Sequence, residues 1–241
     1  AVIRQADIYP IADPEPAQPI RPDAIAGTLK KLRAGEAVTV AFLGDSITLG
    51  AEAGHWWNDR SKTYTGLVMA GLKKRFPRAE LAEVGGHQSG GTTRKGMQIF
   101  TDKIRPANPD ILFIALGAND ANGRRSPKVP PDEFEQNLRT IIGQAREDGT
   151  EVVLVTCLEP MRIGATERMP AYRQVMHALA KDLGVGCADV TQDWRNLATR
   201  GIPPFTQLHN CSNHPGTFGM TVYADCILRF FDPEDTKRET P

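Results

Sequence analysis

Cysteine, net charge and long apolar runs are all scarce in this sequence, and each scarcity excludes a class of protein. The chain has four cysteines, and none has the close Cys-x-x-Cys spacing that is typical of zinc and redox sites. Its 29 basic and 29 acidic residues cancel, so charge gives no basis for binding nucleic acid or an anionic membrane. The longest apolar run, residues 111–116, has strand length, far below the roughly 20 residues of a membrane span. We therefore expect no metal site, no nucleic-acid partner and no membrane span.

The cysteines and the first residue bear on cross-linking and location. Cys157 falls in a predicted strand and is expected to be a buried thiol. Cys211 and Cys226 flank a late His-Pro pair, where a disulfide between them is one possibility. No signal peptide is visible, yet the chain begins at Ala1 without a methionine, as a mature exported protein or a trimmed chain would. We favour a secreted or periplasmic location, with the cytoplasm as the alternative.

The length of 241 residues suits one large domain. Residues 1–22 hold five prolines and little periodicity, which predicts an extended arm, and residues 233–241 form a predicted charged tail. Between them, residues 23–232 are predicted to be a single catalytic domain. This segment contains no internal repeat.

Short apolar segments alternate with amphipathic ones along this domain. Helices are predicted at 24–33 (capped by Asp23), 64–76, 94–104, 132–147 and 170–183, and in a closing segment to about Phe231. Strands are predicted from Val38 to Gly44 and at 79–84, 110–116, 151–156 and 185–190, with a loop and half-helix at 191–204. Strict strand–helix alternation predicts an α/β fold with three α/β/α layers and a parallel sheet of about five strands.

Four polar blocks lie where these segments end or begin. The first strand, almost without alternation, stops at Gly44-Asp45-Ser46, and the carboxyl ends of such strands are where open α/β sheets place their chemistry. Ser46 is therefore a candidate nucleophile, provided that a base lies within reach. The other blocks are the glycine-rich segment 85–93, Gly117-Ala118-Asn119-Asp120, and His214-Pro215. Taken singly, the second block is a loop that caps a helix and the third is a turn.

In this order, from Gly44 to Gly219, the blocks resemble those of the SGNH, or GDSL-type, hydrolase family. The resemblance implies a flavodoxin-like strand order 2-1-3-4-5 and a carboxylic ester hydrolase with Ser46 as nucleophile and His214 as base. It further implies that the Ser46 N–H, the Gly90 N–H and the Asn119 amide form the oxyanion hole. Asp120 is expected to be a structural turn residue.

One position departs from the family pattern, in which an aspartate three residues before the histidine orients the imidazole. Cys211 stands at that position. Either a backbone carbonyl or an amide orients His214, or a carboxylate elsewhere does so, or the enzyme is weak. We favour the first two explanations; the carboxylates considered are Glu159, Asp189 and Asp193.

Several side chains near the blocks have two interpretations. Trp56 and Trp57 are expected to pack under the next helix, with a pocket wall as the alternative. His87 and Gln88 precede the second block and are candidates to face substrate. The charges at Glu159, Arg162 and Arg168 are expected to be solvated, with the rim of the cleft as the alternative.

The predicted function is that of a serine esterase acting through an acyl-Ser46 intermediate. The absence of a long apolar lid, and the tryptophans and arginines near the expected cleft, favour short-acyl esters on a polar carrier, with O-acetyl groups on carbohydrate as first choice. No cofactor is expected, because neither a metal cluster nor a phosphate-binding glycine loop is present. The alternatives are a thioesterase, lysophospholipase or acyltransferase on the same scaffold, and a degenerate module that binds glycans without catalysis. The oligomeric state is not indicated.

Overall fold

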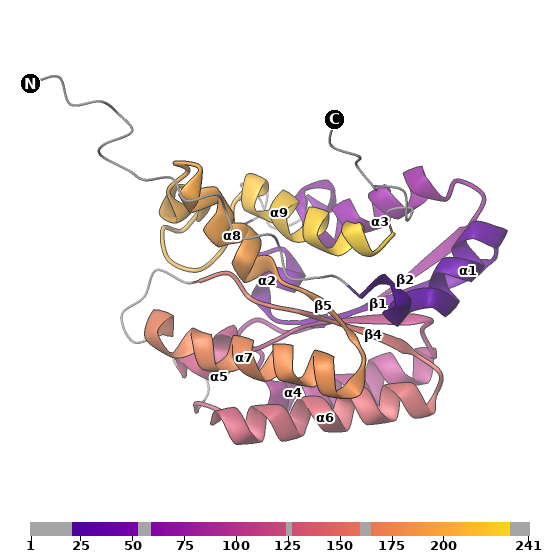
Figure 1. The fold of residues 1–241 in the computed structure, drawn as a ribbon, viewed down its shortest axis with the longest axis horizontal. Coiled ribbons are helices and arrows are strands. Elements are labelled where there is room, and N and C mark those ends of the chain that lie inside the picture. The colour runs from indigo at the N-terminus through magenta and orange to yellow at the C-terminus, as the bar shows by residue number, and fades with distance from the viewer. Residues whose placement is uncertain (1–20, 53–58, 124–126, 160–164, 232–241) are drawn as a thin grey trace, which may run out of the picture.

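The fold is a five-stranded parallel sheet covered by helices on both faces (Figure 1). The computed structural model describes residues 21–52, 59–123, 127–159 and 165–231. The strands lie in the order β2-β1-β3-β4-β5, and every neighbouring pair is parallel, which confirms the predicted fold class and strand order. Their bounds are β1 (Ala37–Gly44), β2 (Glu80–His87), β3 (Ile111–Ala115), β4 (Glu151–Val155) and β5 (Gly186–Ala188). The predicted tail, and the predicted arm but for its last two residues, lie outside the described residues.

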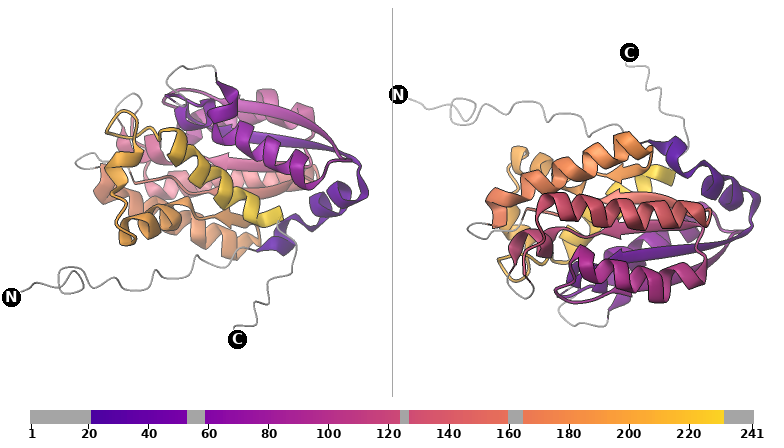
Figure 2. Two further views of the ribbon diagram at one scale, coloured as in Figure 1. Left: turned by 90° about the horizontal axis from the view of Figure 1, so that it is seen from above. Right: turned by 90° about the horizontal axis from the view of Figure 1, so that it is seen from below.

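Helices form the two outer layers, and Figure 2 shows each layer from its own side. One layer holds α3 (Tyr64–Arg75), α8 (Val190–Thr199) and α9 (Thr217–Leu228). The opposite layer holds α4 (Thr93–Ile99), α6 (Pro131–Glu147) and α7 (Ala165–Leu183). The helix α1 (Ala26–Ala34) lies towards one end of the sheet.

Each face of the sheet has its own apolar core, because successive side chains of a strand point to opposite faces. Val40 and Phe42 of β1 lie in the core under α3 and α9, whereas Ala41 and Leu43 lie in the core over α6 and α7. All four are fully buried. This explains why β1 is an uninterrupted apolar run, as expected for a strand covered on both sides.

The remaining elements are short. They are η2 (Pro22–Ile25), α2 (Ser46–Leu49), η4 (Arg60–Lys62), η5 (Phe100–Ile104), η6 (Arg105–Ala107), α5 (Ala118–Asn122), η7 (Pro204–Gln207) and η8 (Arg229–Phe231). Two of them, η5 and η8, continue α4 and α9 without a break. Two, α2 and α5, follow the carboxyl ends of β1 and β3.

Four predicted boundaries are wrong. The second strand does not end at residue 84, because β2 continues to His87. Asp23 does not cap the first helix, because it lies inside η2 and its carboxylate accepts a hydrogen bond from Arg21. Pro170 does not begin α7, which starts at Ala165 and includes the proline. The fifth strand ends at Ala188, since Asp189 instead caps α8 by accepting a hydrogen bond from the Gln192 N–H. The predicted loop and half-helix is therefore a ten-residue helix followed by a loop.

The cysteines are all free. Cys157 is buried, as predicted, but the possible disulfide is not formed, because Cys226 is buried within α9 whereas Cys211 is exposed. In the described part of the chain, no helix is both long enough and apolar enough to span a membrane.

Candidate active site

Ser46 lies in the turn between β1 and α2. Gly44 is required there, because a Cβ at this position would come within 1.8 Å of the Thr48 hydroxyl oxygen. Asp45 then caps the short helix α2, its carboxylate accepting a hydrogen bond from the Ile47 N–H over 2.8 Å. Ser46 is thereby held at the carboxyl edge of the sheet, with 6% of its surface exposed.

His214 is in hydrogen-bonding contact with this serine. The distance from Ser46 Oγ to His214 Nε2 is 2.9 Å, although the two residues are 168 positions apart in the sequence. When the imidazole carries its proton on Nδ1, the hydroxyl donates to Nε2. In that state the ring can accept the hydroxyl proton as a general base.

The loop that carries His214 is closed on itself by hydrogen bonds. Asn210 Oδ1 accepts hydrogen bonds from the N–H groups of Ser212, Asn213 and His214 over 2.9–3.1 Å. The His209 N–H donates to the His214 carbonyl, and Leu208 and Pro215 form an isolated β-bridge. These bonds fix the backbone at His214 without any regular secondary structure.

The two other predicted blocks lie at the same edge of the sheet. Gly90 has φ +75°, a left-handed conformation that favours glycine, and the following Gly91 N–H donates to the Gln88 carbonyl. Asn119 is the second residue of α5, which follows β3, and its side-chain amide donates one hydrogen bond to Asp45 Oδ2 over 2.8 Å. A second amide N–H of Asn119 remains for another acceptor.

Buried carboxyl groups connect these turns. Asp120 Oδ1 accepts hydrogen bonds from the Thr93 N–H and hydroxyl over 2.9 and 2.6 Å, and the Asn137 amide donates to the same hydroxyl. Burial, with a smaller contribution from the nearby Asp120 carboxyl, raises the pKa of Asp45 to about 7. Burial likewise raises the pKa of Asp120. Asp120 therefore ties the turn before α4 to the turn after β3.

Residues 42–222 match the model of the GDSL-like Lipase/Acylhydrolase family. The chain belongs to this family. The match begins in β1 and ends in α9, so it includes Ser46, Gly90, Asn119 and His214.

Two curated proteins are similar over about half of the GDSL-type chain. An arylesterase of Vibrio mimicus is 28% identical over 122 residues, which are 51% of this chain and 56% of that protein. An uncharacterised lipoprotein of Bacillus subtilis, YqeF, is 28% identical over 121 residues, 49% of this chain and 47% of the other. The chain thus spans about half the length of the curated relatives that it matches.

Solved structures are similar over a larger share. LAE5, an α/β hydrolase from the metagenome of Lake Arreo, is 25% identical with a TM-score of 0.69, covering 81% of this chain and 97% of that one. Axe2, an acetylxylan esterase from Geobacillus stearothermophilus, has a TM-score of 0.71 at 21% identity, covering 84% and 97%. The second likeness shows the shared fold.

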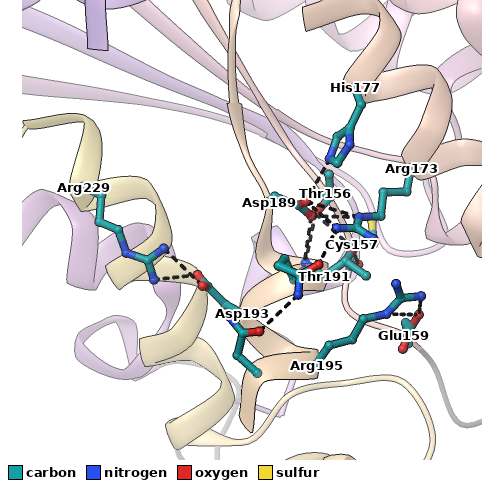
Figure 3. Close-up of polar contacts among 12 residues, drawn as sticks. Thr156, Cys157, Glu159, Arg173, His177, Asp189, Thr191, Asp193, Arg195 and Arg229 are labelled. Atoms are coloured by element: carbon teal, nitrogen blue, oxygen red, sulfur yellow. Dashed lines mark hydrogen bonds and ion pairs between the residues drawn. The ribbon is translucent and has the colours of Figure 1, made fainter. Parts of the chain in front are cut away.

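The three acids considered as replacements for the family's aspartate are paired elsewhere (Figure 3). Glu159 pairs with Arg195, Asp193 with Arg229, and Asp189 with Arg173 and His177. Burial opposes ionisation of Asp189, but the contact with His177 and the hydrogen bonds that Arg173 donates outweigh burial and hold the pKa of this carboxyl below its usual range. None of the three contacts His214 in the described part of the chain, so these three candidates are wrong, whereas the alternative of a carboxylate elsewhere stays open.

The carboxylate beside His214 belongs to Glu52, which sequence reasoning missed. Glu52 Oε1 lies 3.2 Å from His214 Nδ1, an ion-pair distance whose angle is not that of a hydrogen bond. The other oxygen lies 3.8 Å from His209 Nδ1. The signal in the sequence that could have identified Glu52 is its place two positions after Gly50, the glycine at which α2 ends and the chain reverses.

The other predicted side chains have mixed outcomes. The expectation of solvated charges is wrong for Glu159, which is paired, and for Arg168, whose Nε donates to the Ala121 carbonyl over 2.7 Å. His87 and Gln88 are exposed at the end of β2, and a role facing substrate stays a prediction. Trp56, Trp57 and Arg162 lie outside the described residues. Among the residues that are described, no cluster of three or more His, Cys, Asp or Glu could hold a metal ion.

Proposed function

We propose that this chain is a serine esterase that hydrolyses a carboxylic ester through an acyl-Ser46 intermediate, with His214 as the general base. The contact of 2.9 Å between Ser46 Oγ and His214 Nε2 carries the proposal. It lies at the carboxyl edge of a parallel sheet, in a chain of an acylhydrolase family.

Acylation begins when Ser46 Oγ attacks the ester carbonyl carbon while its proton moves to His214 Nε2. The carbonyl electron pair moves to oxygen, and the Ser46 N–H, the Gly90 N–H and the free Asn119 amide N–H donate to that oxyanion. When the intermediate collapses, the bond to the alcohol breaks and His214 gives its proton to the leaving oxygen. Water then attacks the acyl group by the same steps and restores Ser46.

The substrate within this proposal is a short-acyl ester, with O-acetyl groups on carbohydrate as first choice. The low exposure of Ser46 favours a small acyl group at the nucleophile. Leu49, Phe205 and Phe218 are 37–52% exposed in α2, η7 and α9, elements next to the two reacting residues, and aromatic faces suit sugar rings. Axe2 acts on acetylated xylan by its name, and it shares this fold.

An extracytoplasmic location belongs to the same proposal. The Bacillus relative is named a lipoprotein, which supports export of this chain as well. A non-catalytic glycan-binding module is disfavoured, because it has no need for a serine hydroxyl in contact with an imidazole.

The test is hydrolysis of p-nitrophenyl acetate, butyrate and octanoate by wild type, Ser46→Ala and His214→Ala. We expect each variant to lose at least ~10³-fold in kcat, as for other serine–histidine pairs. Ser61→Ala is a matched control, because the Ser61 hydroxyl donates to the Asp59 carboxylate and not to His214. Rates that fall with acyl length support short-acyl chemistry, and product transferred to an added alcohol identifies an acyltransferase. Wild-type rates no higher than those of Ser46→Ala would refute the proposal.

A further inference from the structure

The Nδ1 atom of His214 needs an acceptor. It is buried and has no hydrogen-bond partner among the described residues. Cys211, at the position of the family's aspartate, is exposed. A buried N–H without an acceptor is destabilising, and a base whose second nitrogen is unsupported has no fixed tautomer.

Glu52 Oε1 is the carboxylate oxygen that faces this nitrogen, 3.2 Å away. The side chains of Glu52 and His214 are 23% and 16% exposed, so water screens their attraction only in part. A small rotation of either group would turn the contact into a hydrogen bond. Catalytic hydrogen bonds are often long or poorly aligned before substrate binds.

The backbone at Glu52 is in an unfavourable conformation, which places the Glu52 carboxylate beside His214. Glu52 has φ +67°, in the left-handed region that few residues other than glycine occupy. Gly50, two residues earlier, has φ +87°, and the Ala51 N–H donates to the Ser46 carbonyl. The chain thus reverses directly after α2 and carries the carboxylate back towards the nucleophile. Strain of this kind in a residue beside reacting groups points to a functional role.

A second imidazole borders the same carboxylate. His209 Nδ1 lies 3.8 Å from Glu52 Oε2. His209 also donates its backbone N–H to the His214 carbonyl, so both histidines belong to one closed loop. Glu52 therefore lies between two rings whose backbones are fixed to each other.

We infer that Glu52 is the positioning residue that orients His214, in place of the aspartate that other members of the family use. This inference rests on the proposed function. The carboxylate keeps the proton of the neutral ring on Nδ1, so that Nε2 is free to take the Ser46 proton. It then stabilises the imidazolium, and no proton passes to Glu52.

The first test compares Glu52→Gln with wild type on p-nitrophenyl acetate. The amide keeps the size of the side chain and removes its charge, and we expect kcat to fall by about 10²–10⁴-fold with KM within twofold. Glu159→Gln is the matched control, because that carboxylate pairs with Arg195 and not with His214, and its kcat should equal the wild-type value. A kcat of Glu52→Gln within twofold of wild type would overturn the inference.

A second variant separates positioning from structural support. Glu52→Gly removes the carboxylate and suits φ +67°, so we expect its Tm to equal or exceed that of wild type while kcat falls as in Glu52→Gln. A large fall in Tm together with kcat would instead indicate a structural role. In proton NMR, the downfield Nδ1–H resonance of His214, identified by its loss in His214→Ala, should also be lost in Glu52→Gln.

The inference and the proposed function fail in distinguishable ways. If Ser46→Ala and His214→Ala lose activity while Glu52→Gln keeps it, only the role of Glu52 is refuted. If Ser46→Ala retains the wild-type rate, the esterase proposal itself is refuted.

Discussion

The two halves of the candidate site are held in different ways. The half that contains Asn119 and Gly90 follows the carboxyl ends of β3 and β2, the two strands that flank β1. Buried Asp45 and Asp120 accept hydrogen bonds from neighbouring turns there. The half that contains His214 lies on a loop closed by hydrogen bonds to the Asn210 side chain and between backbone groups, and its ring faces a carboxylate from another loop. The sheet fixes the first half, whereas the second depends on local turns. This difference explains how the acid beside His214 can come from a sequence position other than the one in the family pattern, while the other blocks match that pattern.

The largest effect should come from the charge state of Asp45 in the sheet-bound half. Its pKa is about 7 in the fold against 3.8 as a free group, because burial disfavours the anion. Between these two values the folded state holds a proton that the unfolded state has lost. The contribution of protonated Asp45 to the free energy of unfolding is therefore complete below about pH 4, and it is lost as the pH rises to about 7. The loss is up to about 4 kcal/mol by linkage.

The measurement is urea unfolding of wild type and Asp45→Asn from pH 4 to 8. The difference between their free energies of unfolding isolates Asp45, because other titrating groups are common to both proteins. A difference that stays constant over this range would contradict the assigned pKa.

Next in size is the removal of the carboxyl that joins two turns. Asp120→Ala leaves the Thr93 N–H and hydroxyl without their acceptor inside a site with no exposed surface, and we expect a loss of about 3 kcal/mol in unfolding free energy. Asp120→Asn keeps an accepting oxygen and should lose less. Equal stabilities of Asp120→Ala and wild type in denaturant would show that the link contributes nothing.

A matched change in the loop-held half should have a smaller effect on stability. Asn210→Ala removes the oxygen that accepts three backbone N–H bonds, and we expect a loss of about 1–2 kcal/mol and a fall of roughly tenfold in kcat. Asn210→Asp retains the accepting oxygen and serves as control. A larger stability loss than in Asp120→Ala would reverse the comparison between the halves.

The smallest predicted effect is a gain. In a Glu52→Gln background, Cys211→Asp places a carboxylate where the family has one, at a residue with φ +52° that aspartate tolerates better than most residues. We expect about a tenfold recovery of kcat, equal to about 1.4 kcal/mol. No recovery would mean that a side chain at position 211 does not reach His214 Nδ1.

The sequence predicted the strands and the four blocks because both depend on local signals, whereas the strand order followed from the resemblance to the family. Apolar runs without alternation mark strands covered on two faces, and Gly44 or Gly90 marks a backbone that only glycine fits. The position of Glu52 depends on two left-handed residues, and no periodicity reports where such a turn carries a side chain. The pairing of Glu159 with Arg195 was missed for the same reason, since tertiary packing decides which opposite charges meet.

The separation of Ser46 and His214 by 168 residues also sets an order in time. A ribosome adds about 5–20 residues per second, so the histidine leaves the ribosome roughly 10–30 s after the serine. Glu52, six residues from Ser46 in the sequence, emerges with the serine, well before His214. A nascent chain that stops before residue 214 would therefore have its hydroxyl and its carboxylate but no proton acceptor between them, and would be inert towards esters during synthesis.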